Sequence, residues 1–312
     1  MDLTELLRPK EQGVQENPQY TKEEYAALKK AEREELWARV DAQAESVFAD
    51  DTALRGFLDF TANCTPQRTA NLLLLYQQNP EIRQPRTFEG WKKAGRSVRT
   101  GETGYTALIG QNYEREDGRA AAGYNIGKMF DISQTKGRPP IEPPRFEPEE
   151  LVAAAIENSP VAIRISDQLP DRVQAQYVPK AHSVFVRNGM DAPSTFCAIT
   201  REQAQAGFDT DRSYRRADYI AASYCVAYVT AKRYGLDVAE FDLSPAVNAC
   251  AGLEVQNKRL FLFDVKSAAY TIRKALDRGL IPRESELTAE GFSVPESSPQ
   301  RKTHRTKSAA RE

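Results

Sequence analysis

The stretch from Asn71 to Thr135 holds the most informative pattern in this sequence. It reads Asn71-Leu72-Leu73-Leu74-Leu75-Tyr76, then Asn79-Pro80, then Trp91-Lys92-Lys93-Ala94-Gly95-Arg96-Ser97-Val98-Arg99-Thr100-Gly101-Glu102, and ends with Phe130-Asp131-Ile132-Ser133-Gln134-Thr135. Between Arg83 and Gly101 there are six basic residues and one acidic residue. Single-stranded nucleic acid binds where a basic surface lies beside aromatic rings on which bases stack. The stretch therefore predicts a local nucleic-acid-binding patch.

The candidate stacking rings of this patch are Trp91, Tyr105, Tyr113 and Tyr124. The candidate phosphate contacts are Lys92, Lys93, Arg96 and Arg99. A second interpretation stays open, because a basic run is commonly a solvated face and a tryptophan is commonly part of the core. The leucines at helical spacing predict core packing. Asn71 opens this apolar run, so its side chain must find a polar partner or face a ligand.

Length and composition indicate two domains with solvated tails. The chain has 312 residues, 40% of them apolar, and a mean hydropathy of −0.60. No apolar run reaches about 18 residues, which predicts no membrane segment. The start of the chain lacks the features of a signal peptide, so we expect a cytoplasmic protein.

Cysteine usage and net charge exclude several classes of protein. The four cysteines are far apart in the sequence, which argues against a zinc ribbon or a disulfide framework. The formal net charge is −1. A protein that coats DNA with a wholly basic surface is therefore excluded, as is an acidic mimic of DNA. Any DNA contact must come from a local patch, and no cofactor is expected.

The first domain is predicted to be small and α+β, over residues 21–138. Residues 1–20 are expected to be disordered, and Thr21 with Glu24 forms a capping-box pattern that starts a long helix to about Ala49. Further helices are expected over residues 52–60, 66–78 and 88–94. A strand over residues 105–110, a turn at 114–119 and a returning strand over 123–132 predict a hairpin or short sheet.

A proline-rich linker over residues 139–148 is predicted to separate the two domains. The second domain, residues 149–280, is expected to begin with a helix over 149–158 and a strand over 161–165. A hairpin of residues 175–179 and 183–186 then precedes helices over 193–207 and 215–234, the latter ended by Gly235. A segment over 258–263 and a helix over 265–278, capped by Gly279, close it. Residues 281–312 form a basic tail with the composition of a disordered segment.

The motifs quoted above together resemble the N-terminal domain of the antirestriction protein ArdC and its LtrC-like relatives, over roughly residues 20–140. Members of this family are encoded on conjugative plasmids and integrative elements. The resemblance implies a domain that binds single-stranded DNA without strong sequence preference. Combined with the cations and rings above, it predicts the DNA-binding residues Asn71, Tyr76, Trp91, Lys92, Lys93, Arg96, Arg99 and Tyr105. Asp131 would repel phosphate, so we expect it and Gln134 to bind neighbouring backbone amides instead.

The second domain resembles the zinc-peptidase halves of ArdC-like and ImmA/IrrE-like proteins. These carry His-Glu-x-x-His, in which two imidazoles share a zinc ion and the Glu activates its water. Here the corresponding run reads Arg201-Glu202-Gln203-Ala204-Gln205. In the family a further Glu, just before a Val-Ala-Tyr-Val run, supplies the third ligand, and Tyr224 is the residue that aligns with it here.

The resemblance therefore predicts a zincin-like α+β fold that has lost its metal site. A permanent cation at Arg201 disfavours a divalent ion. The chain has only two histidines, His182 and His304, so a two-histidine site at helical spacing is excluded. We expect no metal, no catalytic residue and no enzymatic activity. An unusual metal site built from Cys197, Glu202 and His182 is the alternative.

These inferences combine into a two-domain accessory protein of a mobile genetic element, of the conjugation or antirestriction type. Its N-terminal domain would bind single-stranded DNA, and its non-catalytic peptidase-like domain would offer a surface to a protein partner. Two alternatives remain. One is a metalloprotease that acts on DNA-bound proteins through a non-standard site. The other is a protein-protein adaptor that does not bind DNA.

Overall fold

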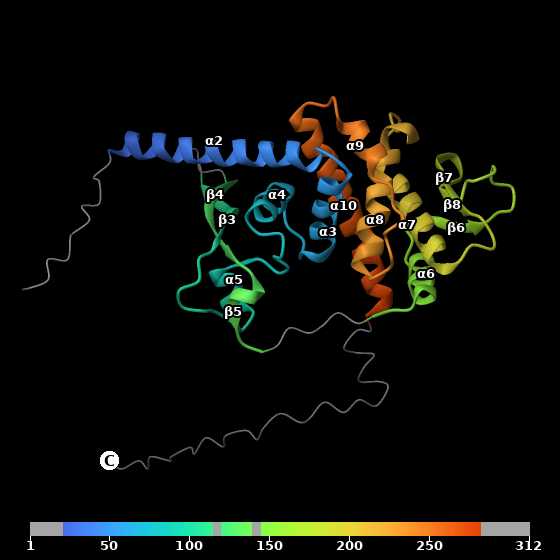
Figure 1. Ribbon diagram of the computed structural model, residues 1–312, viewed down its shortest axis with the longest axis horizontal. Coiled ribbons are helices and arrows are strands. Elements are labelled where there is room, and N and C mark those ends of the chain that lie inside the picture. The colour runs from blue at the N-terminus through green and yellow to red at the C-terminus, as the bar shows by residue number, and fades with distance from the viewer. Residues whose placement is uncertain (1–20, 115–119, 139–144, 282–312) are drawn as a thin grey trace, which may run out of the picture. The chain divides into compact units, whose positions relative to one another are not determined.

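A computed structural model describes residues 21–114, 120–138 and 145–281 (Figure 1). It contains helices and small sheets, which confirms the mixed α+β class. The described residues form two compact units, one of residues 21–138 with 237–267 and the other of residues 145–236 with 268–281. Several sequence predictions fall outside the described residues: the disordered segments 1–20 and 282–312, the turn at 115–119 and linker residues 139–144.

Three helices open the first unit: α2 (Lys22–Val47), α3 (Asp51–Asn63) and α4 (Thr69–Gln78). The predicted capping box is confirmed at the start of α2. The Glu24 amide donates to Thr21 Oγ1 over 3.2 Å, and the Thr21 amide donates to Glu24 Oε2 over 2.8 Å. The leucines at positions 72–75 of α4 are all buried, which confirms their role in the core.

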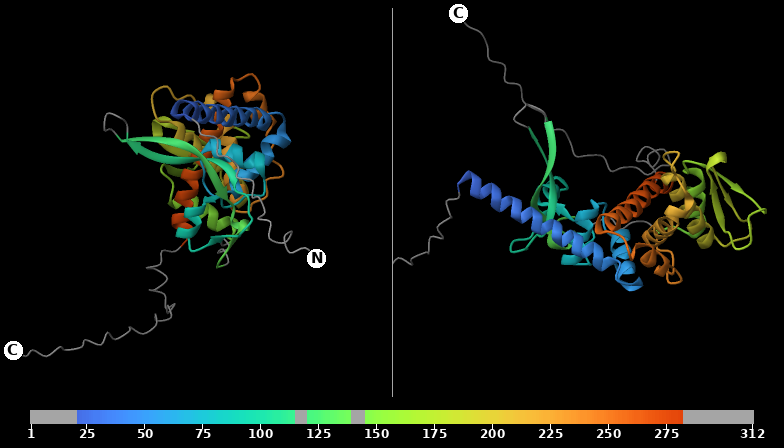
Figure 2. Two further views of the ribbon diagram at one scale, coloured as in Figure 1. Left: turned by 90° about the vertical axis from the view of Figure 1, so that its left-hand side faces the viewer. Right: turned by 90° about the horizontal axis from the view of Figure 1, so that it is seen from above.

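Two small antiparallel sheets follow the helices. The larger has the strand order β1–β4–β3, from β1 (Arg86–Thr87), β4 (Ala120–Phe130) and β3 (Tyr105–Glu114). The smaller pairs β2 (Ser97–Val98) with β5 (Thr135–Lys136). The short helix α5 (Phe88–Lys93) lies between β1 and β2 in the chain, and η1 (Ile132–Gln134) directly precedes β5. The hairpin of β3 and β4 is confirmed and is longer than predicted (Figure 2).

The first unit is completed by residues 237–267, which we expected in the second domain. Hydrogen bonds explain the difference. Arg55 on α3 donates to the carbonyls of Val238 and Phe241. The Leu243 amide donates to Asp51 Oδ1 over 2.8 Å. Helix α9 (Ser244–Cys250) follows directly. The helices at the start of the chain thus bind this distant segment through polar contacts that sequence patterns do not reveal.

The last helix also differs from the prediction. Residues 258–263 and 265–278 belong to one continuous helix, α10 (Val255–Leu280), and Gly279 lies within it and is not its cap. No proline or glycine interrupts the helix before Gly279, which explains its continuity. In the first unit, Lys258 and Arg259 of α10 form ion pairs with Glu45 and Asp41 of α2.

The second unit packs helices against a three-stranded sheet of strand order β6–β8–β7. Its elements are α6 (Pro148–Glu157), β6 (Ala162–Ile165), β7 (Ala175–Val178), η2 (Pro179–Ala181), β8 (Ser183–Val186), α7 (Ala192–Phe208), η3 (Arg216–Tyr219) and α8 (Ile220–Arg233). The predicted hairpin of β7 and β8 is confirmed, and β6 pairs parallel to β8. Gly235 has a φ of +79° directly after α8, as expected of a helix C-cap. None of the described helices is both long and apolar enough to cross a membrane.

Candidate functional site

Trp91 is part of the core, which contradicts its predicted role as a stacking platform. Its side chain is only 2% exposed, and its Nε1 donates to the Phe130 carbonyl over 2.7 Å. The guanidinium groups of Arg86 and Arg96 lie 5.3 and 5.9 Å from the centre of its ring. Trp91 therefore organises basic residues around itself but offers no free face to a base.

Asn71 is also buried, which contradicts its predicted role in DNA binding. Its Oδ1 accepts from the Leu108 amide over 2.8 Å, and its Nδ2 donates to the Leu108 carbonyl over 3.0 Å. Two turns further along α4, Gln78 makes the same pair of bonds to Thr106, at 2.7 and 2.9 Å. The two amide side chains thus satisfy the outer edge of β3 as a neighbouring strand would. Sequence reasoning missed Gln78.

Two predicted DNA-binding tyrosines are half-buried and take part in the fold. The Tyr76 ring packs against Phe57 and Phe60, with ring centres 5.6 and 5.3 Å apart, and burial raises the pKa of its hydroxyl. Tyr105 accepts a hydrogen bond from Asn79 Nδ2 over 2.9 Å. Both rings contribute to packing between elements, and their contact with DNA stays a prediction. The Tyr113 side chain lies outside the described residues.

Asp131 and Gln134 bind backbone amides, as predicted. Asp131 is buried and accepts from the amides of Arg83, Gln84 and Ser133 over 2.8–2.9 Å. Burial alone would raise the pKa of Asp131, but the hydrogen bonds from Ser133, Gln84 and Arg83 outweigh it and hold the pKa below its usual range. Gln134 accepts from the Asp131 amide over 2.9 Å and donates to the Thr103 carbonyl.

The predicted phosphate-binding arginines are engaged within the protein. Arg96 Nε donates to Thr135 Oγ1 over 2.8 Å, and its Nη1 donates to the Arg138 carbonyl. Arg99 forms an ion pair with Glu102 at 2.6 Å and lowers the pKa of that carboxyl. Arg99 remains exposed, whereas Arg96 is half-buried. To bind phosphate, the guanidinium group of each arginine would have to contact its internal partner and the phosphate at the same time.

A cation and ring surface nevertheless exists on α5. Lys92 and Lys93 are exposed, and no acidic side chain among the described residues pairs with either. Phe88, on the same short helix, is 55% exposed and packs edge-on against Phe130 with ring centres 6.5 Å apart. We define Phe88, Lys92 and Lys93 as the α5 patch. Sequence reasoning found its lysines and missed its ring.

A polar network surrounds Glu202 in the second unit. This residue on α7 is fully buried, and Arg216 binds both of its carboxylate oxygens, at 2.5 and 2.7 Å. The Tyr177 amide at the edge of β7 donates to Oε2 over 2.8 Å, and Arg201 Nε donates to Oε1 over 3.2 Å. Glu202 thus pairs with two cations, Arg216 and Arg201. Arg216 is the principal partner, which sequence reasoning missed.

Gln205 lies one turn further along α7 and is also fully buried. It donates through Nε2 to Ser223 Oγ over 2.9 Å and accepts through Oε1 from the Tyr214 hydroxyl over 2.7 Å. The α8 side chain that contacts Gln205 is therefore Ser223. Ser223 is buried and the neighbouring Tyr224 is half-buried, and the alignment of Tyr224 with the family's third ligand stays a prediction.

Tyr177 joins this network to the nearby loop. Its hydroxyl donates to Asp209 Oδ2 over 2.9 Å and lies 3.4 Å from His182 Nδ1. Burial, and then the bond to Asp209, raises the pKa of Tyr177 to about 12. The hydroxyl is therefore neutral at physiological pH and acts as a hydrogen-bond donor.

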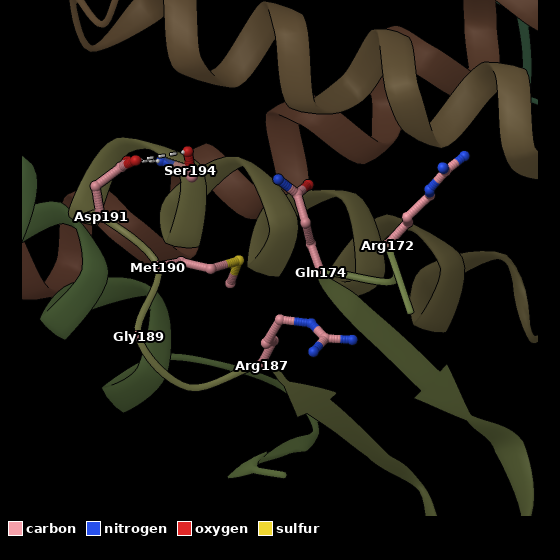
Figure 3. A pocket seen from close by; sticks show the side chains of 7 residues that line it. All are labelled: Arg172, Gln174, Arg187, Gly189, Met190, Asp191 and Ser194. Carbon is pink, nitrogen blue, oxygen red and sulfur yellow. Dashed lines mark hydrogen bonds between the residues drawn. The ribbon is translucent and has the colours of Figure 1, made fainter. Parts of the chain in front are cut away.

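A separate hollow of about 560 Å³ lies where β7, β8 and α7 meet, and it is lined by Arg172, Gln174, Arg187, Gly189, Met190, Asp191 and Ser194 (Figure 3). Arg187 donates to the carbonyls of Leu169, Pro170 and Val173. Asp191 caps α7 by accepting from the Ser194 amide over 2.8 Å. These two charged side chains thus hold the local backbone in place.

The sequence of the first unit matches a known family. Residues 29–138 match the model for the N-terminal domain of anti-restriction factor ArdC. This region is an ArdC-type N-terminal domain. The match contains every predicted DNA-binding residue and the whole α5 patch, and it ends before the second unit begins. No curated protein matches the sequence.

Two solved structures are similar to about two thirds of the chain. Both are crystal structures of the antirestriction ArdC protein from the R388 plasmid. The metal-free structure is 18% identical, covers 68% of this chain and 85% of its own, and has a TM-score of 0.43. The Mn(II)-bound structure is also 18% identical, covers 70% and 87%, and has a TM-score of 0.46. Neither similarity is high enough to carry an argument about the site.

The residues around Glu202 do not fit a metal ion. Both carboxylate oxygens of Glu202 are bound by guanidinium groups. Burial raises the pKa of Cys197 to about 11, which keeps it a neutral thiol and a poor ligand. Within the described ranges, no three His, Cys, Asp or Glu side chains are grouped closely enough to hold a metal. The geometry therefore gives no support to the alternative site of Cys197, Glu202 and His182.

Proposed function

We propose that the ArdC-type domain binds single-stranded DNA. The observation that supports this most directly is the α5 patch, in which a ring with 55% exposure lies on the same helix as two lysines that have no acidic partner among the residues the structure describes. Phe88 and Lys92 are four residues apart and therefore share one face of the helix. A base can stack on the ring while its phosphates bind the lysines, which is the arrangement typical of single-strand binding.

We expect the α5 patch to bind single-stranded DNA more tightly than duplex DNA, for a steric reason. A base can lie against Phe88 only after it has left the base stack, and the bases of a duplex are already stacked and paired. Each stacked base contributes roughly 1–3 kcal/mol to binding. A duplex would offer only its phosphates to Lys92 and Lys93. Its binding would therefore be weaker and wholly electrostatic, and it would weaken further as the salt concentration rises.

The family supports a proposal for the biological role. Because the ArdC-type domain belongs to an antirestriction family, we propose that the protein is an antirestriction or conjugation accessory of a mobile genetic element. Binding to the single strand that enters a recipient cell would place it at the step where restriction acts.

We also propose that the second unit is a non-catalytic relative of a metallopeptidase and serves as a surface for a protein partner. The support is chemical. A general base must reach a water molecule, but the Glu202 carboxylate is fully buried and bound by Arg216, Arg201 and the Tyr177 amide. Metal analysis and peptidase assays of the purified chain test this. Stoichiometric zinc or manganese together with peptide cleavage would overturn it and favour the metalloprotease alternative.

The DNA proposal is tested by titrating a labelled oligonucleotide with the full chain and measuring fluorescence anisotropy. We expect the single strand to bind more tightly than the duplex. The variant K92E/K93E should weaken binding by more than about 25-fold at 0.1 M salt, because each lost phosphate contact costs about fivefold there. Phe88→Ala should weaken it by about 1–3 kcal/mol, the contribution of one stacked base.

Matched controls come from the second unit. Lys180 and Lys274 are exposed, so K180E/K274E changes the net charge by the same amount. Tyr270 is 46% exposed and serves as the control ring for Phe88. Equal losses in both charge variants would show a non-specific charge effect and contradict the α5 patch. No binding of either DNA form by the unaltered chain would favour the adaptor alternative.

A further inference from the structure

A second group of cations and rings lies in the first unit, away from the α5 patch in sequence. Tyr124 on β4 is 36% exposed, and the guanidinium carbon of Arg68 lies 4.3 Å from the centre of its ring. Arg68 is exposed and is the residue directly before α4. Gly110, opposite Tyr124 on β3, has no side chain, which leaves the neighbourhood of the ring open.

Helix α10 contributes a similar pair from outside the ArdC-type domain. Phe263 is 49% exposed, and Lys266 Nζ lies 5.2 Å from the centre of its ring. Both residues belong to the part of α10 that completes the first unit. Burial lowers the pKa of Lys266, and the charge of nearby Arg68 lowers it further. The two cations are therefore close enough to repel each other.

Nothing in the described part of the chain compensates this repulsion. Neither Arg68 nor Lys266 has an acidic partner there. The start of α4 adds to the positive potential, because Arg68 gives the helix no side-chain capping hydrogen bond and the first-turn amides of a helix have no partner within the helix itself. Thr69, in that first turn, has a buried Oγ1 with no partner within the described residues. An anion at this place would relieve the repulsion and accept hydrogen bonds from the Arg68 and Lys266 side chains.

We propose that Arg68, Lys266 and the start of α4 bind a backbone phosphate of single-stranded DNA, with its neighbouring bases against Tyr124 and Phe263. We call these four side chains the α10 subsite. It rests on the proposed DNA binding and extends it: the binding surface continues beyond the ArdC-type domain onto a helix from the far end of the sequence. A single strand then contacts two places on the first unit, the α5 patch and the α10 subsite.

The test measures oligonucleotide affinity of the full chain at several salt concentrations, with the variants R68A/K266A, Phe263→Ala and the α5 variant K92E/K93E. R68A/K266A should weaken binding by about fivefold per lost phosphate contact at 0.1 M salt and reduce the salt slope by about 0.7 per contact. The matched control is Lys274→Ala, because Lys274 is an exposed lysine two turns further along α10. This variant should leave the affinity and the salt slope unchanged.

A second readout separates binding from folding. If Lys266 serves to bind an anion, Lys266→Gln should leave the melting temperature of the free protein unchanged or raise it. The substitution removes a half-buried charge that Arg68 repels. A lysine that served only the fold would lower the melting temperature on substitution without changing the salt slope, and that result would overturn the subsite.

The outcomes distinguish the two proposals. If the unaltered chain binds the oligonucleotide and K92E/K93E weakens it while R68A/K266A does not, the α10 subsite is wrong and the α5 patch stands. Loss in R68A/K266A alone supports the subsite and contradicts the α5 patch. If the unaltered chain binds no single strand even at 50 mM salt, the proposed DNA binding and the subsite are both overturned.

Discussion

At the scale of single residues, the pair Glu202 and Arg216 shows how a buried charge is stabilised here. Glu202 has no exposure, so its carboxylate is compatible with the fold only because Arg216 binds both of its oxygens. The hydrogen bonds to Glu202 raise the pKa of Arg216 and keep it charged. An internal guanidinium therefore neutralises the buried carboxylate.

This pair gives a prediction for stability. Arg216→Ala should lower the free energy of unfolding by about 3 kcal/mol, the low end for a broken buried pair, because the Arg216 side chain is itself 34% exposed. The double variant E202Q/R216M should recover part of the loss, since no uncompensated charge remains. Urea denaturation measures both. The control is Arg215→Ala, whose exposed pair with Asp218 should contribute less than about 1 kcal/mol. Equal losses at both arginines would contradict a buried role for Arg216.

At the scale of elements, α4 and β3 are joined by side-chain amides. Asn71 and Gln78 bond to the amide and carbonyl groups of Leu108 and Thr106, so the outer edge of β3 is satisfied without another strand. An unprotected strand edge is a site of aggregation. The outer strand of this hairpin, β3, needs no further strand beside Thr106 and Leu108, because side chains of α4 bond to the backbone there.

Removing either amide should destabilise this junction. Asn71→Ala leaves a buried amide and carbonyl of Leu108 unsatisfied, so the free energy of unfolding should fall by about 2–4 kcal/mol. Hydrogen exchange of the Leu108 amide should become faster in the same variant. Gln77→Ala, at an exposed neighbouring position, is the control and should have little effect. If Asn71→Ala instead weakened DNA binding with no loss of stability, Asn71 would be a DNA contact after all.

At the scale of the whole molecule, the two units are not consecutive in the sequence. Residues 237–267 complete the first unit, and α10 continues into the second. The family match covers residues 29–138 only, so the segment that completes the first unit comes from outside it. Proposed DNA contacts on α10 therefore depend on a part of the chain that an isolated N-terminal fragment lacks.

The sequence by itself determined the local features of this protein. The capping box at Thr21, the buried leucines of α4 and the two hairpins follow from neighbouring residues and their spacing. The amide-binding role of Asp131 also followed, because a carboxylate in a basic stretch favours donors over phosphate. Such features depend on interactions within a few residues, which the order of residues specifies directly.

Only the tertiary structure decided which side chains remain available for binding. Trp91 and Asn71 stand in the most basic and most distinctive stretch, yet partners 37–39 positions away bury them. No sequence motif marks Phe88, Arg68 or Lys266. The fold leaves Phe88 and Arg68 exposed and brings Arg68 near Lys266. Arg216 likewise reaches Glu202 from η3, 14 residues further along the chain. Burial and charge pairing depend on residues distant in sequence, and for that reason the composition of a stretch did not specify its accessible surface.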